Sequence, residues 1–339
     1  MSNQNPTSQK GRGDAQGLDA ALRPRQWNEF VGQERIKKNL RILVDAAKER
    51  RDPIEHLLLG GPAGLGKTTL AHLVAREMET TVRVTSGPAI ERIGDLAALL
   101  TNLQPREILF IDEVHRLSKL IEEVLYPAME SRVLDIMIGK GPSARTIQLE
   151  LPPFTLVAAT TRIGLLSSPL RSRFGNTFRF EFYTPEELVR ILTRSASVLG
   201  VSLEPDAAAV LARSSRATPR VANRLLKRCR DWAQVHGNTA ITRAVVGQTL
   251  ALMEIDAEGL EPMDRRIMSV IIEKFAGGPV GLQALAAASA EEEDTIIEVY
   301  EPYLMRLGFV ERTPRGRMAT ELAYQHLGIA SRRPQTLLG

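Results

Sequence analysis

The fold is decided by the stretch Leu57-Leu58-Leu59-Gly60-Gly61-Pro62-Ala63-Gly64-Leu65-Gly66-Lys67-Thr68-Thr69-Leu70. It contains the pattern G-x-x-x-x-G-K-T from Gly61 to Thr68, which is typical of a loop that cradles phosphate groups. The apolar run before the loop predicts a buried strand, and the apolar spacing from Thr68 to Met78 predicts a helix. A glycine-rich turn that binds nothing is the alternative, and the regular strand and helix on either side argue against it.

Each part of this loop has an expected role toward a nucleotide. Gly61, Gly64 and Gly66 let the backbone fold around phosphates because no Cβ stands in the way. Backbone N–H groups and the positive end of the following helix then face the anion. Lys67 is expected to reach the outer phosphates, and the Thr68 hydroxyl is expected to bind Mg²⁺. The stretch therefore predicts ATP and Mg²⁺ as cofactors.

A second apolar run, residues 107–113, ends in the acid pair Asp112-Glu113. Ligands of a parallel sheet bind outside the carboxyl ends of its strands, so both acids should arrive beside the phosphates. Asp112 is expected to hold Mg²⁺ through water, and Glu113 to polarise the attacking water as general base. A strand that merely ends in an acidic helix start is the alternative, and it explains one acid better than a pair.

Composition limits the class of protein. The chain has 339 residues, 43% hydrophobic and 25% charged, which is typical of a globular protein with two or three domains. Its single cysteine, Cys229, excludes an internal disulfide framework and is expected to be a buried structural thiol. Residues 1–17 are polar and predict a disordered tail rather than a secretory signal. No membrane-length apolar run is present, so a cytoplasmic protein is expected.

The rest of the first domain, residues 18–183, predicts an α/β fold with a parallel sheet. Further strands are expected at 81–86 and 154–161 and around Phe178, Phe180 and Phe182, with helices at 36–51, 90–103 and 119–129. Trp27 and Phe30, ahead of the first helix, suit an adenine pocket and ordinary core packing equally well.

Three features follow the acid pair along the chain. Residues 133–138 and 145–151 predict an apolar hairpin, which is either covered by its own domain or offered to a partner. We expect exposure, with Leu134 and Ile136 on the docking face. Thr161 ends a strand and suits a hydrogen bond near the γ-phosphate, although a strand-end threonine is common. Arg171 and Arg173 are expected on an exposed turn.

From residue 184 the chain is helical. Thr184-Pro185-Glu186-Glu187 forms a capping box with proline at the first helical position, which predicts a new domain over 184–254. Thr218-Pro219 caps a later helix and places Arg220 in its first turn. A cation is unfavourable beside that helix dipole, so Arg220 is better suited to a ligand. The other basic residues between 213 and 230 suit a solvated face.

Residues 255–339 predict a winged helix, with three helices and a β-hairpin after a polar linker. The third helix opens acidic, with six Asp/Glu and no Lys/Arg over residues 291–301. This charge repels phosphate, so the helix is not expected in a DNA groove. The hairpin wing instead carries Arg312, Arg315 and Arg317, which suit phosphate contacts without sequence preference better than a solvated basic turn.

The order of these motifs resembles that of AAA+ ATPases, and the closer resemblance is to the RuvB family. It covers roughly residue 18 to the end and is carried by Val114-His115-Arg116-Leu117, Leu125-Tyr126-Pro127-Ala128-Met129-Glu130, Ala159-Thr160-Thr161-Arg162, Gly277-Gly278-Pro279-Val280-Gly281-Leu282 and Arg312-Thr313-Pro314-Arg315-Gly316-Arg317-Met318-Ala319-Thr320. The resemblance implies a large AAA+ domain, a small helical AAA+ lid and a winged-helix head.

The resemblance also implies a function. It is branch migration of Holliday junctions in recombination and DNA repair, driven by ATP hydrolysis in a homo-hexameric ring around the duplex DNA that flanks the four-way junction. A junction-binding RuvA partner would contact the 133–151 hairpin, and a RuvC resolvase would join the larger complex. Thr161 would be sensor 1, Arg173 the arginine finger and Arg220 sensor 2. The other implied nucleotide contacts are Leu22, Arg23, Thr69, Glu130, Ser131, Arg132 and Tyr183.

Two positions depart from the family pattern. Ser131-Arg132 stands where an acidic residue and an aromatic are usual, and Ala217 stands where glycine usually precedes Thr-Pro-Arg. The first change affects the expected subunit junction near the hairpin, and the second is expected to stiffen the lid.

Three rival functions share the ATPase core: a protein remodeller, a clamp loader or initiator switch, and a transcription factor that carries an ATPase. The winged helix and the lack of a protease-binding or zinc motif argue against the remodeller. The acidic third helix argues against the transcription factor.

Overall fold

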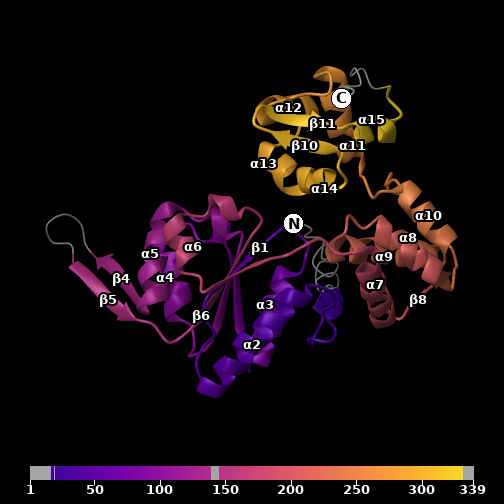
Figure 1. Ribbon diagram of the computed structural model, residues 1–339. Coiled ribbons are helices and arrows are strands. Elements are labelled where there is room, and N and C mark those ends of the chain that lie inside the picture. The colour runs from indigo at the N-terminus through magenta and orange to yellow at the C-terminus, as the bar shows by residue number, and fades with distance from the viewer. Residues whose placement is uncertain (1–16, 19, 139–144, 331–339) are drawn as a thin grey trace, which may run out of the picture. The chain divides into compact units, whose positions relative to one another are not determined.

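The computed structural model describes residues 17–18, 20–138 and 145–330 (Figure 1). The chain forms two compact units, and the second begins at Thr184. Within the described residues, no helix is both long and apolar enough to span a membrane.

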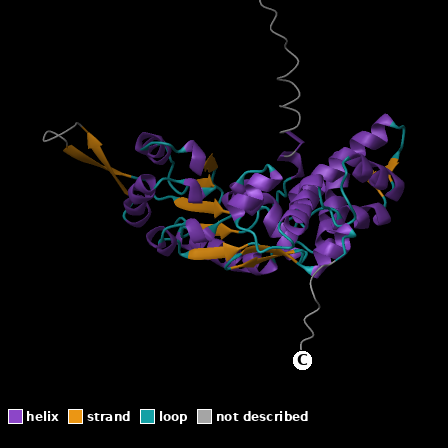
Figure 2. Ribbon diagram, turned by 90° about the horizontal axis from the view of Figure 1, so that it is seen from above, coloured by secondary structure: helices purple, strands orange, loops and turns teal. Residues whose placement is uncertain are grey.

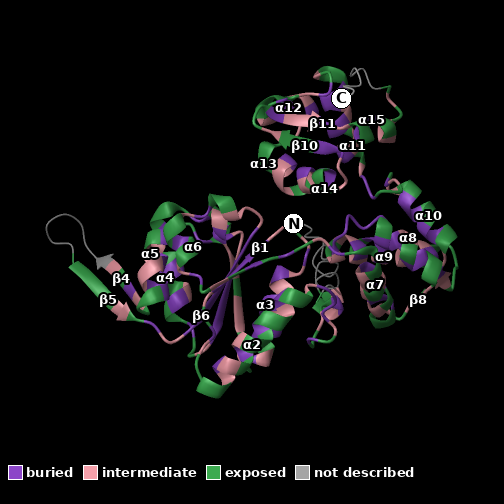
Figure 3. Cartoon of the chain, viewed as in Figure 1, coloured by how far each residue is buried: buried purple, intermediate pink, exposed green. Residues whose placement is uncertain are grey.

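The first unit is built on a five-stranded parallel sheet with the strand order β2-β3-β6-β1-β7. Its strands are β1 (Leu57–Gly60), β2 (Val82–Ser86), β3 (Ile108–Asp112), β6 (Thr155–Thr160) and β7 (Asn176–Arg179). The central strands β1 and β6 are buried throughout, as expected when helices cover both faces of a parallel sheet (Figure 3). The carboxyl ends of β1, β3 and β6 therefore meet at one edge.

Helices cover both faces of this sheet. Figure 1 shows α2 (Glu34–Arg50) and α3 (Lys67–Glu77) on one face, and α4 (Ile93–Thr101), α5 (Lys119–Glu130) and α6 (Ser168–Ser172) on the other. Leucines from α4, α5 and α6 pack on β3 and β6 in a single core. The expected helices near 36–51, 68–78 and 119–129 are thus confirmed, and the helix expected at 90–103 is shorter.

The hairpin consists of β4 (Val133–Ile138) and β5 (Arg145–Glu150), paired antiparallel, and it extends away from the sheet (Figures 1 and 2). The expectation that the apolar side chains of this hairpin are exposed is wrong at its base. Leu134 is fully buried in the core of the first unit, and Ile136 and Leu149 pack against that core. Ile147, the cross-strand partner of Ile136, nevertheless remains 45% exposed. Residues 139–144, its expected loop, lie outside the described residues.

The second unit begins with four helices, α7 (Pro185–Leu199), α8 (Pro205–Arg213), α9 (Pro219–Val235) and α10 (Arg243–Leu252). The capping box at Thr184 is confirmed, because the Thr184 hydroxyl accepts from the Glu187 N–H and the Glu187 carboxylate accepts from the Thr184 N–H. The Thr218 cap of α9 is also present. Two short strands, β8 (Ser202–Leu203) and β9 (Ala240–Ile241), pair in parallel and were not expected.

Cys229, on α9, is fully buried, and burial raises the pKa of its thiol to about 11. The thiol is therefore uncharged at neutral pH, as expected of a structural cysteine.

The winged helix completes the second unit. It contains α11 (Pro262–Ser269), which continues as a π-helical turn (Val270–Lys274), and α12 (Leu282–Ser289). The third helix, expected to be continuous over 291–307, is divided into α13 (Glu293–Thr295), a π-helical turn (Ile296–Tyr300) and α14 (Glu301–Arg306). Pro302, which has no N–H to donate, stands at the start of α14, and this helps explain the change of hydrogen-bond pattern. A last helix, α15 (Glu321–Leu327), was not expected.

The wing is the hairpin of β10 (Val310–Thr313) and β11 (Gly316–Ala319). Thr313 pairs with Gly316 across a two-residue turn formed by Pro314 and Arg315. Gly316 has φ 136°, and a Cβ at this position would lie 2.2 Å from the Val280 carbonyl oxygen. Only glycine allows this close approach, which lets Val280 pair with Arg317 at the base of the wing.

Candidate nucleotide and DNA sites

The P-loop lies between β1 and α3, where the sheet edge meets a helix start. Gly61, Gly64 and Gly66 all have positive φ, which side chains disfavour. At Gly61 the constraint is also spatial, because a Cβ would lie 2.8 Å from the Phe180 carbonyl oxygen. The backbone thus requires glycine where the sequence pattern has it.

Lys67 is the first residue of α3 and is only 7% exposed. Its ammonium donates to the carbonyl oxygens of Gly61 and Pro62, at 2.7 and 2.8 Å, so the lysine folds back over its own loop. Thr68 and Thr69 follow in the first turn of α3 and are half-buried. The first N–H groups of a helix have no partner within it, so this end suits an anion.

The acid pair stands at the same sheet edge. β6 lies between β3 and β1 in this parallel sheet, and its Thr160 pairs with Gly60, so Asp112 ends its strand at the same edge as the P-loop but one strand away from β1. The Asp112 Oδ1 accepts from the Glu113 N–H at 3.0 Å. Glu113 has φ 53°, a left-handed conformation that costs a non-glycine residue energy and is common at functional sites.

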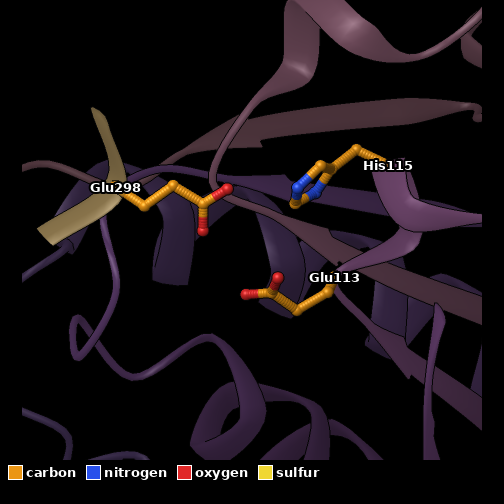
Figure 4. Close-up of side chains that lie close together, drawn as sticks. All are labelled: Glu113, His115 and Glu298. Atoms are coloured by element: carbon orange, nitrogen blue, oxygen red, sulfur yellow. The ribbon is translucent and has the colours of Figure 1, made fainter. Parts of the chain in front are cut away.

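His115 was not singled out for a role from the sequence, although it follows the acid pair closely. It projects from the short turn after β3 together with Glu113 (Figure 4); Glu298, also drawn there, belongs to the second unit. The Thr160 hydroxyl accepts from the Arg162 N–H at 2.9 Å and lies 3.0 Å from the His115 Nδ1. A hydrogen bond between this hydroxyl and the His115 Nδ1 therefore joins the ends of β3 and β6.

Thr161 is placed differently from its neighbour. Its hydroxyl is buried and has no hydrogen-bond partner among the described residues. Buried hydroxyls are nearly always paired, so an orphan directly after β6 suits a bound group at this edge.

Arg173 follows α6, and the expectation of an exposed turn is wrong. Its side chain is 21% exposed, its Nε lies 3.1 Å from the Glu130 Oε1, and its Nη1 donates to the Pro169 carbonyl oxygen at 2.8 Å. Its guanidinium also lies 4.4 Å from the centre of the Tyr126 ring. Arg171, by contrast, is exposed. Nothing in the sequence spacing showed that α5 would hold Arg173.

The other expected nucleotide contacts of the first unit are scattered along the chain. Leu22 is buried and Arg23 exposed, whereas Ser131 and Arg132 are exposed where α5 ends. Tyr183 is buried, and its hydroxyl donates to the Leu65 carbonyl oxygen of the P-loop at 3.2 Å.

Trp27 and Phe30 are both buried. A Cβ placed on Gly66 would lie 3.3 Å from the Phe30 ring, so this ring packs directly against the P-loop. The geometry therefore favours core packing for the two rings.

In the second unit, Arg220 is the second residue of α9 and is exposed. Among the described residues no hydrogen bond or ion pair is made by its guanidinium. Ala217 has φ 52°, so the alanine adopts the left-handed conformation for which glycine would be easier.

The wing arginines differ from one another. Arg312 and Arg317 both make bidentate contacts with Glu301, a buried carboxylate of α14, at 2.7–3.3 Å. Arg317 is mostly covered, whereas half of the Arg312 side chain is exposed. Arg315 is exposed at the turn and pairs with nothing in the described residues. Of the three, Arg315 is therefore the most accessible to phosphate.

Three family models match consecutive parts of the chain. The P-loop domain of the Holliday junction DNA helicase RuvB matches residues 22–180, the RuvB AAA lid domain 183–256, and the RuvB C-terminal winged-helix domain 257–328. The chain belongs to the RuvB family. The expected order of a P-loop domain with a parallel sheet, a helical lid and a winged helix is confirmed.

Individual relatives agree with this assignment. The chain is 59% identical to the Holliday junction branch migration complex subunit RuvB of Dehalococcoides mccartyi over 312 residues, which cover 92% of this chain and 89% of that protein. The solved RuvB Holliday junction branch migration motor of Thermotoga maritima is 50% identical with a TM-score of 0.85, covering 91% and 99% of the two chains. A substituted form of that protein gives a TM-score of 0.86. RuvB-family membership argues against the three rival functions.

Proposed function

We propose that this chain is the ATPase subunit of a homo-hexameric ring that moves the duplex DNA flanking a four-way junction and so drives branch migration. The observation that carries the proposal is the meeting of a P-loop and an acid pair at one sheet edge, in a chain that also bears a wing with an accessible arginine. The names of the relatives, a branch migration complex subunit and a branch migration motor, agree with it.

In this proposal the first unit binds ATP through the P-loop. Lys67 would exchange its two loop carbonyls for the outer phosphates, and the N–H groups that open α3 would hold the others. The Thr68 hydroxyl and the Asp112 carboxylate fit Mg²⁺, because hard oxygen donors suit this cation and Asp112 Oδ2 makes no hydrogen bond within the described residues. Bound Mg²⁺ would neutralise charge on the phosphates.

Glu113 is the proposed general base, and the orphan Thr161 hydroxyl is proposed to bind the γ-phosphate or the attacking water. Arg173 is proposed to act on the ATP of the neighbouring subunit. It follows α6, which lies on the opposite face of the sheet from α3, the helix that bears Lys67 (Figure 1). Arg220 is proposed to sense the nucleotide, because its guanidinium is exposed in the first turn of α9.

Two surfaces are proposed to meet partners. The apolar surface that the hairpin leaves exposed, represented by Ile147, would dock a RuvA-like junction-binding protein, with a RuvC-like resolvase in the larger assembly. The wing would contact duplex phosphates through Arg315, with Arg312 beside it.

Mixed rings test the shared ATP site. Lys67→Ala protein should be inactive alone and Arg173→Ala protein should keep only a small residual rate, whereas their mixture should regain substantial ATPase activity. Some interfaces of a mixed ring then combine an intact P-loop with an intact Arg173. If no activity returns although mixed rings form, Arg173 does not act between subunits.

A further inference from the structure

One face of α5 carries Glu122, Tyr126 and Glu130, which are spaced four residues apart and so lie in line along the helix. We infer that Tyr126 is the positioning residue of Arg173: its ring supports the guanidinium, and its hydroxyl holds the start of the short helix that bears it. The inference rests on the proposed role of Arg173 in ATP hydrolysis.

The ring contact fixes one end of α6. The Arg173 guanidinium lies 4.4 Å from the centre of the Tyr126 ring, within the range of a cation–π contact. The Nη1 of the same guanidinium donates to the Pro169 carbonyl oxygen, and its Nε lies 3.1 Å from the Glu130 carboxylate as an ion pair, although the geometry makes no hydrogen bond there. An arginine side chain has many rotamers, and the ring contact, the ion pair and the hydrogen bond together limit how many Arg173 can adopt.

The hydroxyl fixes the other end. The Tyr126 hydroxyl lies 3.0 Å from the Ser167 Oγ, and it donates to the Glu122 carboxylate at 3.3 Å. A carboxylate only accepts, so the Ser167 hydroxyl must donate to Tyr126. The Ser167 oxygen meanwhile accepts from the Leu170 N–H at 3.3 Å as the N-cap of α6. Each polar hydrogen in this series of hydrogen bonds has one acceptor, and the series ends at the buried carboxylate of Glu122.

Tyr126 therefore contacts both ends of one five-residue helix. A helix of this length is not stable by itself and takes its position from what it packs against. Here the same side chain binds its N-cap residue and supports the arginine that follows it. Tyr126 is itself only partly buried, so core filling alone does not account for it.

A double-mutant cycle separates positioning from general support. We would measure ATP turnover and the affinity for a fluorescent ATP analogue in full-length Tyr126→Leu and Tyr126→Phe proteins, each with Arg173 and with Arg173→Ala. Tyr126→Leu should lower kcat about tenfold, and Tyr126→Phe, which keeps the ring, about two- to threefold. Analogue affinity should stay within about twofold of wild type. In the Arg173→Ala background neither substitution should lower the residual rate further.

The control is Val124→Ala. Val124 lies on the same helix, and its partly buried side chain packs on the same core. It should lower the melting temperature and leave kcat unchanged. Equal losses of kcat from Tyr126→Leu with and without Arg173, or a loss of analogue affinity, would overturn the inference. If Tyr126→Leu does not fold, the cycle with Tyr126→Phe decides alone, and a loss that persists without Arg173 overturns it. An unchanged kcat in the Arg173→Ala protein would instead contradict the proposed role of Arg173 in ATP hydrolysis.

Discussion

Removal of Arg216 should destabilise the attachment of the winged helix to the lid helices. Arg216 lies between α8 and α9, and its guanidinium donates to Asp264 of α11 and, at 2.8 Å, to the Val299 carbonyl oxygen. It also lies 5.0 Å from the centre of the Tyr303 ring. Arg216→Met keeps much of the side-chain volume and removes the charge.

The magnitude follows from what the substitution leaves behind. Asp264 is 0% exposed, and without Arg216 its carboxylate keeps the Glu261 N–H, 2.8 Å away, as its one hydrogen-bond partner among the described residues. Its Oδ1 has no partner in the described residues even with Arg216 present. Loss of one member of a buried ion pair costs about 3–5 kcal/mol, because the other charge stays buried and uncompensated.

The penalty should depend on pH in a definite direction. Burial raises the pKa of Asp264 to about 6, and Arg216 acts against this shift. A carboxyl with a raised pKa in the folded state contributes stability that is present below its usual pKa and is lost as pH rises through about 6. Without Arg216 the pKa should rise further, so the penalty of Arg216→Met should be smaller at pH 5 than at pH 8.

Hydrogen exchange measures this locally, which suits a chain with several domains that need not unfold together. Protection of backbone amides in residues 262–274 should fall about 100- to 5,000-fold in Arg216→Met at pH 8 after correction for intrinsic rates, and less at pH 5. Arg228→Met, which replaces an exposed arginine of α9, is the control. A loss below about fivefold at pH 8, or an equal loss at both pH values, would refute the reasoning.

The other predictions concern nucleotide, DNA and partner. Lys67→Ala should weaken ATP binding, whereas Glu113→Gln should bind ATP and fail to hydrolyse it; equal affinity losses would contradict the two roles. Arg315→Ala should weaken duplex binding alike on two unrelated sequences and reduce the salt slope by about one, and an unchanged slope would exclude a phosphate contact there. Ile147→Asp should abolish binding of a RuvA-like partner while basal ATPase persists, whereas Ile42→Asp, an exposed isoleucine on α2, should retain it.

Structural features that depend only on residues close together in the sequence were predictable. The P-loop glycines and the capping box at Thr184 depend on residues within a few positions of one another, so the pattern and the structure agree. The strands beside the P-loop are buried on both faces, which a short apolar run indicates directly. The same holds for the winged helix, whose helix and hairpin order can be read along the chain.

Features that depend on long-range packing were not predictable. Leu134 is buried because the base of the hairpin packs on the core around α5, and an apolar alternation cannot show which half of a hairpin is covered. The expected exposed arginine, Arg173, is held by Glu130 from another helix.

The wing shows the same limit. Its three arginines look equivalent in sequence, yet two of them, Arg312 and Arg317, form ion pairs with Glu301. The acidic third helix was interpreted from its charge alone, and one of its six acids turns out to organise the wing.

Strand exchange at a synthetic four-way junction tests the central claim most directly. Wild-type protein with a RuvA-like partner should convert the junction into duplex products only when ATP and Mg²⁺ are present. Glu113→Gln protein, which should still bind ATP, should give no conversion under the same conditions. Conversion by the wild type without ATP, or undiminished conversion by Glu113→Gln, would contradict the claim that this chain is an ATP-driven branch-migration motor.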